Sequence, residues 1–291
     1  MRLPFAARLT RPRLIIAAAV LAIAGLLIAV GGQTGPAHAA TGRAAQASVA
    51  SWTSGPKPAI VLVHGAWADS GSWNGVIGRL QLAGYTVYVP PNPLRGVTYD
   101  SAYLADFLSA ISGPIVLAGH SYGGFVITNA ATGNPNVKAL VYDDAYIPTQ
   151  GDTLAGLTSV KPGSCLGSAP FNAVPYPGSP AGDADLYVKA SVFPGCFANG
   201  LPPAEAAVLA ATQRPLAASV TTEQSGPPAW KTIPSWDIVG TADNVLPPAE
   251  QLAMAHNAGA SITEINAPHL SMITDPGVVA SVIIQAARAT S

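Results

Sequence analysis

A serine between glycines, Ser121 in LAGHSYGGFV (residues 117–126), has the setting that most directly suggests chemistry. An apolar run enters this G-x-S-x-G pattern and an amphipathic run leaves it, which predicts a strand, a tight turn and a helix. Glycines at 119 and 123 relieve crowding in such a turn, where the serine adopts a strained backbone. The hydroxyl would face the following helix N-terminus, which favours negative charge. The pattern indicates a nucleophile, and the alternative is a Gly-Ser turn without chemistry.

A serine hydroxyl needs a base, and the chain has five histidines. His38 lies in the N-terminal segment, His120 is the variable residue of the serine motif, and His256 falls in a helical run. His269, in INAPHLSMITDP, follows the last predicted strand. Loops at the carboxyl ends of parallel strands converge on one site, so we expect His269 to reach the serine. The alternative is a structural loop histidine. His64, in HGAW, is expected to shape its loop.

An acid is needed to orient the imidazole and stabilise its charged form. Asp243, in IVGTADNVLPP, follows the penultimate predicted strand and completes the order Ser…Asp…His. Its alternative role is local turn hydrogen bonding. Asp143 and Asp144, at the end of VKALVYDD, remain rival candidates because that strand also delivers its loop to the site. Asp237 suits the role less, since it lies inside a predicted strand.

Acyl transfer also requires donors for the oxyanion. One is expected from the backbone N–H of Tyr122, directly after the serine, and the other from the loop after IVLVHG. The simplest choice in that loop is Ala66, with its neighbour Trp67 left open. Each such donor contributes about 3–4 kcal/mol to stabilising the transition state.

The elements that must position these residues alternate between short apolar runs and longer amphipathic ones. Runs that are apolar throughout indicate a sheet covered on both faces, and the helices between them indicate parallel strands. The fold class is therefore α/β, with a doubly wound, mostly parallel sheet. Strands are expected at residues 59–65, 85–90, 114–121, 137–145, 235–240 and 261–266, and helices at 70–84, 99–112, 122–132, 247–259 and 275–289.

A segment rich in Pro, Gly, Ala and Ser, about residues 147–233, interrupts this alternation and predicts an inserted cap. Short helices are expected within it at DADLYVKASVF (183–193) and PPAEAAVLAATQRPLA (202–217). Cys165 and Cys196 both fall in this segment. In an exported protein an even pair usually forms a disulfide, which would staple the cap to itself. Two free thiols are the alternative.

The N-terminus has the layout of a secretory signal peptide over residues 1–39. MRLPFAARLTRPR carries four arginines, an uncharged apolar run follows, and Ala37 and Ala39 form an A-x-A cleavage pattern. An uncleaved membrane anchor is the alternative. Cleavage would leave a flexible segment (40–57), a domain over 58–290, and a secreted protein without stable membrane association.

The charge balance argues against nucleic acid as a partner. The chain has 14 Lys and Arg and 15 Asp and Glu, and four arginines lie in the expected signal. Ten basic against 15 acidic residues then remain, a net charge of −5 with no basic patch to grip phosphates.

Taken together, VLVHGAW, LAGHSYGG, VYDDAYIP, PSWDIVGTADNVLPP and APHLSMITDP resemble α/β-hydrolase-fold serine esterases. The resemblance is to bacterial carboxylesterases similar to plant methyl esterases and hydroxynitrile lyases, and it covers residues 58–287. It implies Ser121 as nucleophile, Asp243 as acid, His269 as base, Ala66 and Tyr122 as oxyanion donors, and no cofactor. The sequence departs from the family in its longer, Gly/Pro-rich cap and its cysteine pair.

The expected function is a secreted serine hydrolase that cleaves carboxylic esters of small to medium apolar substrates through an acyl-enzyme. Lactonase activity is the nearest alternative. A hydroxynitrile lyase would use the same triad as base and usually needs a lysine near the site. The sequence near the motifs shows none, and Lys161 and Lys189 in the cap are the candidates to approach it. A haloalkane dehalogenase is disfavoured, because it needs Asp in place of Ser121. A binding protein without catalysis is a further alternative.

Overall fold

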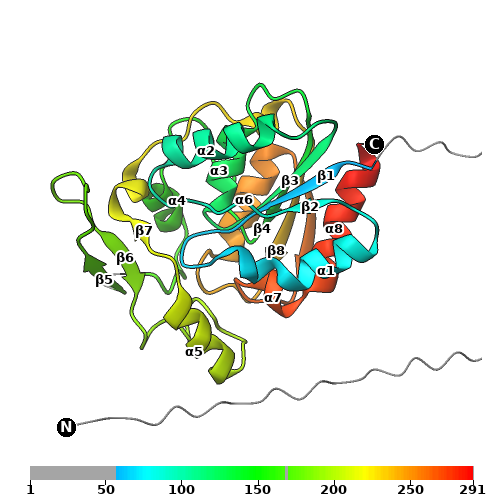
Figure 1. Cartoon of the computed structure of the whole chain (residues 1–291). Helices are drawn as coiled ribbons and strands as arrows, with labels where there is room; N and C mark the ends of the chain where they lie inside the picture. Colours follow the sequence, from blue (N-terminus) through cyan, green and yellow to red (C-terminus); the bar gives the residue numbers. More distant parts are fainter. Residues whose placement is uncertain (1–56, 168–169, 291) are drawn as a thin grey trace, which may run out of the picture. The chain divides into compact units, whose positions relative to one another are not determined.

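A parallel sheet of six strands forms the centre of the computed structural model, which describes residues 57–167 and 170–290 (Figure 1). The strand order is β2-β1-β3-β4-β8-β9. The strands are β1 (Ala59–Val63), β2 (Val87–Tyr88), β3 (Ile115–His120), β4 (Val137–Asp143), β8 (Ser235–Gly240) and β9 (Ser261–Ile265). Every expected strand is present, although β2 is much shorter than the expected 85–90.

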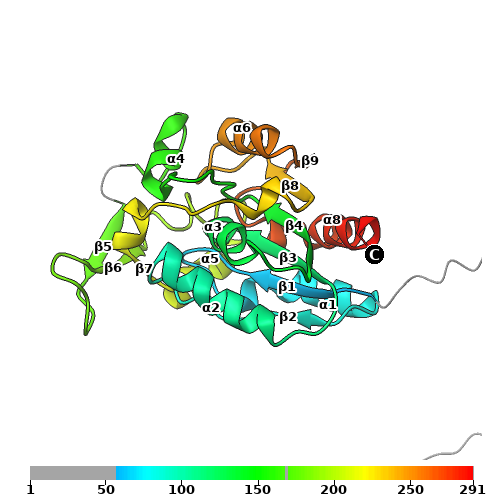
Figure 2. The same ribbon diagram turned by 90° about the horizontal axis from the view of Figure 1, so that it is seen from above.

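Helices cover both faces of this sheet, as Figure 2 shows from above: α2, α3 and α6 lie on one side and α1 and α8 on the other. Every residue of β3 and β8 is buried, which explains why these runs are apolar rather than alternating. The doubly wound α/β class is thereby confirmed. The helices are α1 (Asn74–Leu82), α2 (Val97–Ser109), α3 (Gly123–Ala130), α6 (Pro248–Ala258), the short α7 (Ser271–Thr274) and α8 (Pro276–Ala289). A 3₁₀ turn (Ser70–Trp73) precedes α1.

The chain between β4 and β8 forms the cap. It contains a second sheet of three antiparallel strands, in the order β5-β6-β7. In both views this sheet lies to one side of the main sheet (Figures 1 and 2). The elements are α4 (Leu154–Val160), β5 (Phe171–Val174), β6 (Asp185–Val188), α5 (Pro203–Thr212), β7 (Leu216–Ala217) and 3₁₀ turns at Ala218–Thr222 and Ala229–Lys231.

One of the two helices expected in the cap is wrong. Residues 183–193 contain the strand β6 followed by a turn, whereas the helix expected within 202–217 is confirmed as α5. The register pairs Leu186 with Ala173 and Val188 with Phe171. Pairing with partners distant in sequence overrides the weak local preference of so short a segment.

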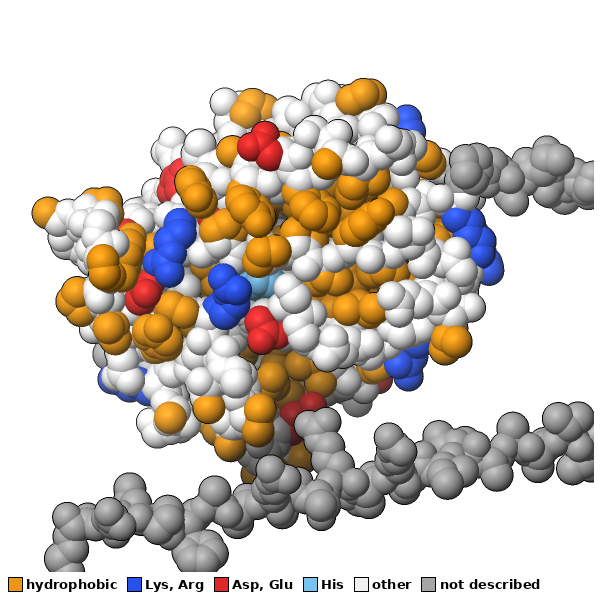
Figure 3. Space-filling model, in the orientation of Figure 1, with side chains coloured by type: hydrophobic (Ala, Val, Ile, Leu, Met, Phe, Trp, Pro, Cys, Tyr) orange, Lys and Arg blue, Asp and Glu red, His pale blue; other side chains and the backbone are white. Residues whose placement is uncertain are grey.

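Cys165 and Cys196 form a disulfide with their Cα atoms 5.6 Å apart, as expected. The expected signal peptide (1–39) lies outside the described residues. No helix among residues 57–167 and 170–290 is long and apolar enough to cross a membrane. On the face drawn in Figure 3, the few charged side chains are scattered among hydrophobic and uncharged polar ones.

Candidate active site

Ser121 occupies the tight turn between β3 and α3 and has a φ of +53°, a strained value for a residue with a side chain. The turn packs so closely that glycine is required beside it. A Cβ atom on Gly123 would lie 2.6 Å from the carbonyl oxygen of Val63, and one on Gly124 would lie 2.0 Å from that of Tyr146. The glycines of the motif therefore allow the approach of neighbouring backbone, and the serine side chain faces the cavity described below.

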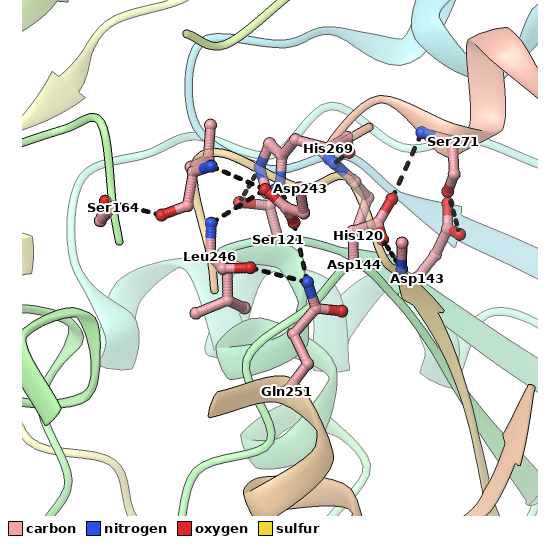
Figure 4. Close-up of polar contacts among 12 residues, drawn as sticks. His120, Ser121, Asp143, Asp144, Ser164, Asp243, Leu246, Gln251, His269 and Ser271 are labelled. Carbon is pink, nitrogen blue, oxygen red and sulfur yellow. Dashed lines mark hydrogen bonds and ion pairs between the residues drawn. The ribbon is translucent and has the colours of Figure 1, made fainter. Parts of the chain in front are cut away.

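His269 connects Ser121 to Asp243, as Figure 4 shows. Its Nε2 lies 3.0 Å from Ser121 Oγ, although the two residues are 148 positions apart in sequence. Its Nδ1 lies 2.8 Å from Asp243 Oδ2. All three residues are buried, with His269 completely removed from solvent. The structure thus brings together the three side chains singled out from the sequence.

Asp243 is held by donors from its own loop and from α6. Its Oδ1 accepts hydrogen bonds from the amides of Val245 (2.7 Å) and Leu246 (3.0 Å). Its Oδ2 accepts one from Gln251 Nε2 (2.8 Å) as well as facing His269. Sequence reasoning missed Gln251; the available signal was a polar residue on the face of α6 that carries buried apolar side chains.

The rival aspartates make no hydrogen bond to the histidine side chain among the described residues, and both bond instead to Ser271, two positions after it. Asp143 Oδ1 accepts a hydrogen bond from Ser271 Oγ (2.7 Å). Asp144 accepts one from the Gly240 amide (2.7 Å) and a longer one from the Ser271 amide (3.3 Å). These contacts join the ends of β4 and β8 to the loop that carries His269 (Figure 4).

Burial shifts the titration of three aspartates near this loop. It raises the pKa of Asp143 to about 7, and the charge of Asp243 adds to the shift. The pKa values of Asp144 and Asp237 are also raised well above the usual range, chiefly by burial and then by the charge of Asp143. Asp237 lies within β8, as expected. Burial thus favours the uncharged form of all three carboxyls, which limits the negative charge beside Asp243.

His120 supports the backbone of His269 and has no part in the hydrogen bonds of its side chain. Its Nε2 donates to the carbonyl oxygen of His269 (2.8 Å), and the two rings lie 4.7 Å apart. Burial lowers the pKa of His120 well below its ordinary value, and the neighbouring His269 adds to the shift. A neutral ring here avoids a second positive charge beside His269.

His64 shapes its loop, in line with the sequence. Its Nδ1–H donates to the carbonyl oxygen of Gly65 (2.9 Å), and its Nε2 accepts from the Asn92 amide (3.0 Å). Burial lowers its pKa to about 4, so the ring is neutral near pH 7. His256 is exposed on α6.

The amides of Ala66 and Tyr122 are both available beside the serine. In the part of the chain that the structure describes, neither donates a hydrogen bond to a protein acceptor, and both residues line the same cavity as Ser121. The Trp67 amide, in contrast, donates to the carbonyl oxygen of Arg214 (3.0 Å). Of these two neighbours, Ala66 is therefore the one whose amide has no protein acceptor among the described residues.

The side chain of Tyr122 is anchored by an aspartate that the sequence did not single out. The hydroxyl donates to Asp100 Oδ2 (2.8 Å), and Asp100 also accepts from the Arg95 amide (3.0 Å). Burial raises the pKa of both Tyr122 and Asp100. In the sequence, an acidic residue near the start of α2 reads as an ordinary helix N-terminal charge.

The serine opens into a cavity of about 590 Å³ between the main sheet and the cap. Trp67 stacks on Phe171, with ring centroids 5.2 Å apart. Lys161 lines the cavity, and Lys189 is not among the lining residues. The apolar side chains of the lining are Ala66, Trp67, Tyr122, Tyr146, Leu154, Ala155, Pro162, Leu166, Phe171, Leu186 and Val245. This volume lies within the range of pockets that hold drug-sized ligands, and most of the lining is apolar.

Comparison with known proteins shows that the chain is similar to hydrolases. The chain is 36% identical over 111 residues to a carbendazim hydrolyzing esterase from Nocardioides sp. (strain SG-4G), a match that covers 33% of this chain and 46% of the esterase. The match therefore spans less than half of that esterase.

The fold is also found in solved structures of other hydrolases, among them the following two. A pyrethroid hydrolase from Sphingobium faniae JZ-2 is 25% identical, with a TM-score of 0.61 over 80% of this chain and 98% of that one. An extracellular α/β-hydrolase from a Paenibacillus species is 21% identical, with a TM-score of 0.63 over 79% and 98%. The sequence pattern of the alpha/beta hydrolase family also matches residues 60–282. Because that match spans most of the chain, this protein belongs to the alpha/beta hydrolase family.

Proposed function

We propose that the protein is a serine hydrolase that cleaves carboxylic esters. The observation that carries the proposal is the position of His269, within hydrogen-bonding distance of both Ser121 Oγ and Asp243 Oδ2. Nucleophile, base and orienting acid in this relation define the hydrolytic triad, whichever fold carries them. The partial match to an esterase supports the same reaction class.

In the proposed mechanism Ser121 Oγ attacks the ester carbonyl while His269 Nε2 accepts the hydroxyl proton. Asp243 holds the Nδ1–H tautomer and stabilises the imidazolium that forms. The oxyanion accepts hydrogen bonds from the amides of Ala66 and Tyr122. His269 then protonates the departing alkoxide. Water, activated by the same histidine, hydrolyses the acyl-enzyme and restores the serine.

The cavity supports esters of small to medium apolar groups as substrates. Its volume of about 590 Å³ leaves room on both sides of the ester bond, and the stacked rings of Trp67 and Phe171 offer an aromatic wall. Away from Lys161 the walls are mostly apolar and favour neutral groups on the substrate, because a charged group there would lose hydration without gaining a partner. The names of the carbendazim and pyrethroid hydrolases point in the same direction.

A lyase acting on cyanohydrins is the second candidate, and a lactonase differs only in the ring form of the ester. The lyase remains a candidate because Lys161 lines the cavity and would place a cation near the substrate. Release of cyanide from a cyanohydrin, with no hydrolysis of p-nitrophenyl esters, would favour the lyase over the esterase.

The decisive test is Ser121→Ala. We expect this variant to lose ester hydrolysis by a factor of about 10⁴ or more and to lose labelling by a fluorophosphonate probe. Its circular dichroism should match the parent protein. Ser281→Ala, on the exposed face of α8, is the matched control and should keep full activity. Most of the turnover surviving in Ser121→Ala would refute the assignment of the nucleophile.

A further inference from the structure

The disulfide Cys165–Cys196 joins two cap segments that both contact the surroundings of His269 and Asp243. The two cysteines are 31 residues apart in sequence, and Cys196 is buried while Cys165 is partly so. The sequence suggests that the bond stabilises the cap by linking two of its segments. The contacts of the neighbouring residues indicate a second role for the bond.

The first segment, which contains Ser164 and Cys165, hydrogen-bonds to the loop that follows Asp243. The Cys165 amide donates to the carbonyl oxygen of Asn244 (2.7 Å). Ser164 Oγ, labelled in Figure 4, donates to the carbonyl oxygen of Val245 (2.7 Å). Asn244 and Val245 directly follow Asp243, and the Val245 amide is itself a donor to the Asp243 carboxylate (2.7 Å). The segment therefore fixes the backbone of Val245, whose amide in turn fixes the Asp243 carboxylate.

The second segment contacts the same loop and the histidine. Asn199 Nδ2 donates to the carbonyl oxygen of Ala242 (3.0 Å), the residue before Asp243. The buried ring of Phe197 meets the His269 ring edge-on, with centroids 5.3 Å apart and planes at 67°. Residues 196–199 thus touch the acid loop from its other end and limit the movement of the imidazole.

Neither segment belongs to a helix or strand. The first lies between α4 and β5, and the second between β6 and α5. Regular hydrogen-bond ladders therefore do not fix either position, and the covalent bond is the direct link between them. Cross-linking restricts their relative movement, and a shift of about 1 Å in a catalytic group can lower a rate by about a hundredfold.

We propose that the Cys165–Cys196 bond positions Asp243 and His269, so that full turnover requires the oxidised pair. The cysteines are positioning residues, since they act through the two loops and do not touch the substrate. This inference rests on the proposed triad of Ser121, His269 and Asp243.

The test compares the oxidised protein with the protein reduced by a phosphine and with the Cys165→Ala/Cys196→Ala variant. Both changes should lower kcat for a p-nitrophenyl ester by about tenfold or more, with KM changed by less than about twofold. The downfield proton resonance of a histidine Nδ1–H bonded to a carboxylate should weaken in parallel. Reductant should have no effect on the double variant, and reoxidation should restore the parent.

Glu223→Ala separates positioning from general loosening of the cap. The Glu223 carboxylate, in the cap, accepts hydrogen bonds from the amides of Val97 (2.6 Å) and Thr98 (2.9 Å) at the start of α2, away from the triad. This variant should lower the melting temperature while kcat and the downfield resonance stay at parent values.

Ser164→Ala/Asn199→Ala keeps the disulfide and removes the two side-chain hydrogen bonds to the acid loop. This variant should also lower kcat. If the protein does not fold without the disulfide, the proposal is tested with this variant instead. The proposal is overturned if reduction lowers the melting temperature but leaves kcat and the resonance unchanged, or if this variant keeps full kcat. Failure of the proposed function is distinguishable, because the oxidised parent would then neither hydrolyse esters nor label at Ser121.

Discussion

At the scale of single residues, the Asp243 carboxylate is surrounded by four hydrogen-bonding partners, three of them amide donors and the fourth His269. An ionised carboxylate has acceptor sites for all of them. The arrangement fixes the carboxylate plane and, through it, the orientation of the imidazole. Asp143 and Asp144, by contrast, serve the loop after the histidine.

This difference predicts the ranking of three substitutions. Asp243→Asn should lower kcat by about 10³–10⁴, because an amide at this position favours the wrong histidine tautomer. Asp143→Asn and Asp144→Asn should lose much less, since their contacts reach His269 through Ser271. Steady-state kinetics on one ester measures all three. A larger loss at Asp143 or Asp144 than at Asp243 would overturn the choice of acid.

Asp143 also predicts a pH dependence of stability. Its pKa is about 7 in the folded protein, against 3.8 for the ordinary side chain, so the folded state retains the proton over that interval. The stability from this group is present in full below about pH 4 and is lost as the pH rises to 7.

Asp143→Asn cannot titrate, so it should escape this loss. Between pH 5 and 8 the free energy of unfolding of the parent should fall relative to the variant by on the order of 2 kcal/mol. Urea unfolding at the two pH values measures the difference. Parallel pH profiles for the two proteins would contradict the proposed titration.

At the scale of elements, the helix α3 can follow the serine turn only because its first residues have no side chains. Gly124 lies against the carbonyl oxygen of Tyr146, whereas Gly78, inside α1, has no atom within 4 Å of the position of an added Cβ. The two glycines occupy helices for different reasons, one for close packing and one without a packing requirement.

Substituting each of these glycines by alanine should therefore change the free energy of unfolding in opposite directions. Gly124→Ala should destabilise the protein by about 1–3 kcal/mol, because the backbone of β3–α3 must move. Gly78→Ala should stabilise it by up to about 1 kcal/mol through helix propensity. Chemical denaturation gives both values. If the two substitutions changed the free energy of unfolding equally, close packing would not be the reason for glycine at position 124.

The strands of the main sheet could be predicted because burial on both faces leaves short runs that are apolar throughout. β3 and β8 are examples. β6 was misread, since Leu186, Tyr187 and Val188 fit a helix as well as a strand when their partners are unknown. Antiparallel pairing with β5 decides the matter, and that pairing depends on where the rest of the cap lies.

At the scale of the whole molecule, an oxidised cysteine pair and an N-terminal leader pattern suit a protein made for export. We propose that the chain is secreted after cleavage near Ala39. Expressed with its own leader, it should appear in the medium with a mass that begins near residue 40 and with both cysteines oxidised. Intact-mass spectrometry tests this, and a secreted or membrane-bound chain that begins at Met1 would contradict it.

The sequence by itself determined the serine turn, the alternation of strands and helices, the cap's position in the chain, and the order of Ser121, Asp243 and His269. These are local or sequential properties, set by glycine spacing and by runs of apolar residues. The tertiary structure alone decided which aspartate faces the histidine, which segments the disulfide joins, and why the Trp67 amide has a protein acceptor while that of Ala66 has none within the described part of the chain. Those depend on hydrogen bonds between loops that are distant along the chain, and no spacing within the sequence encodes such distances.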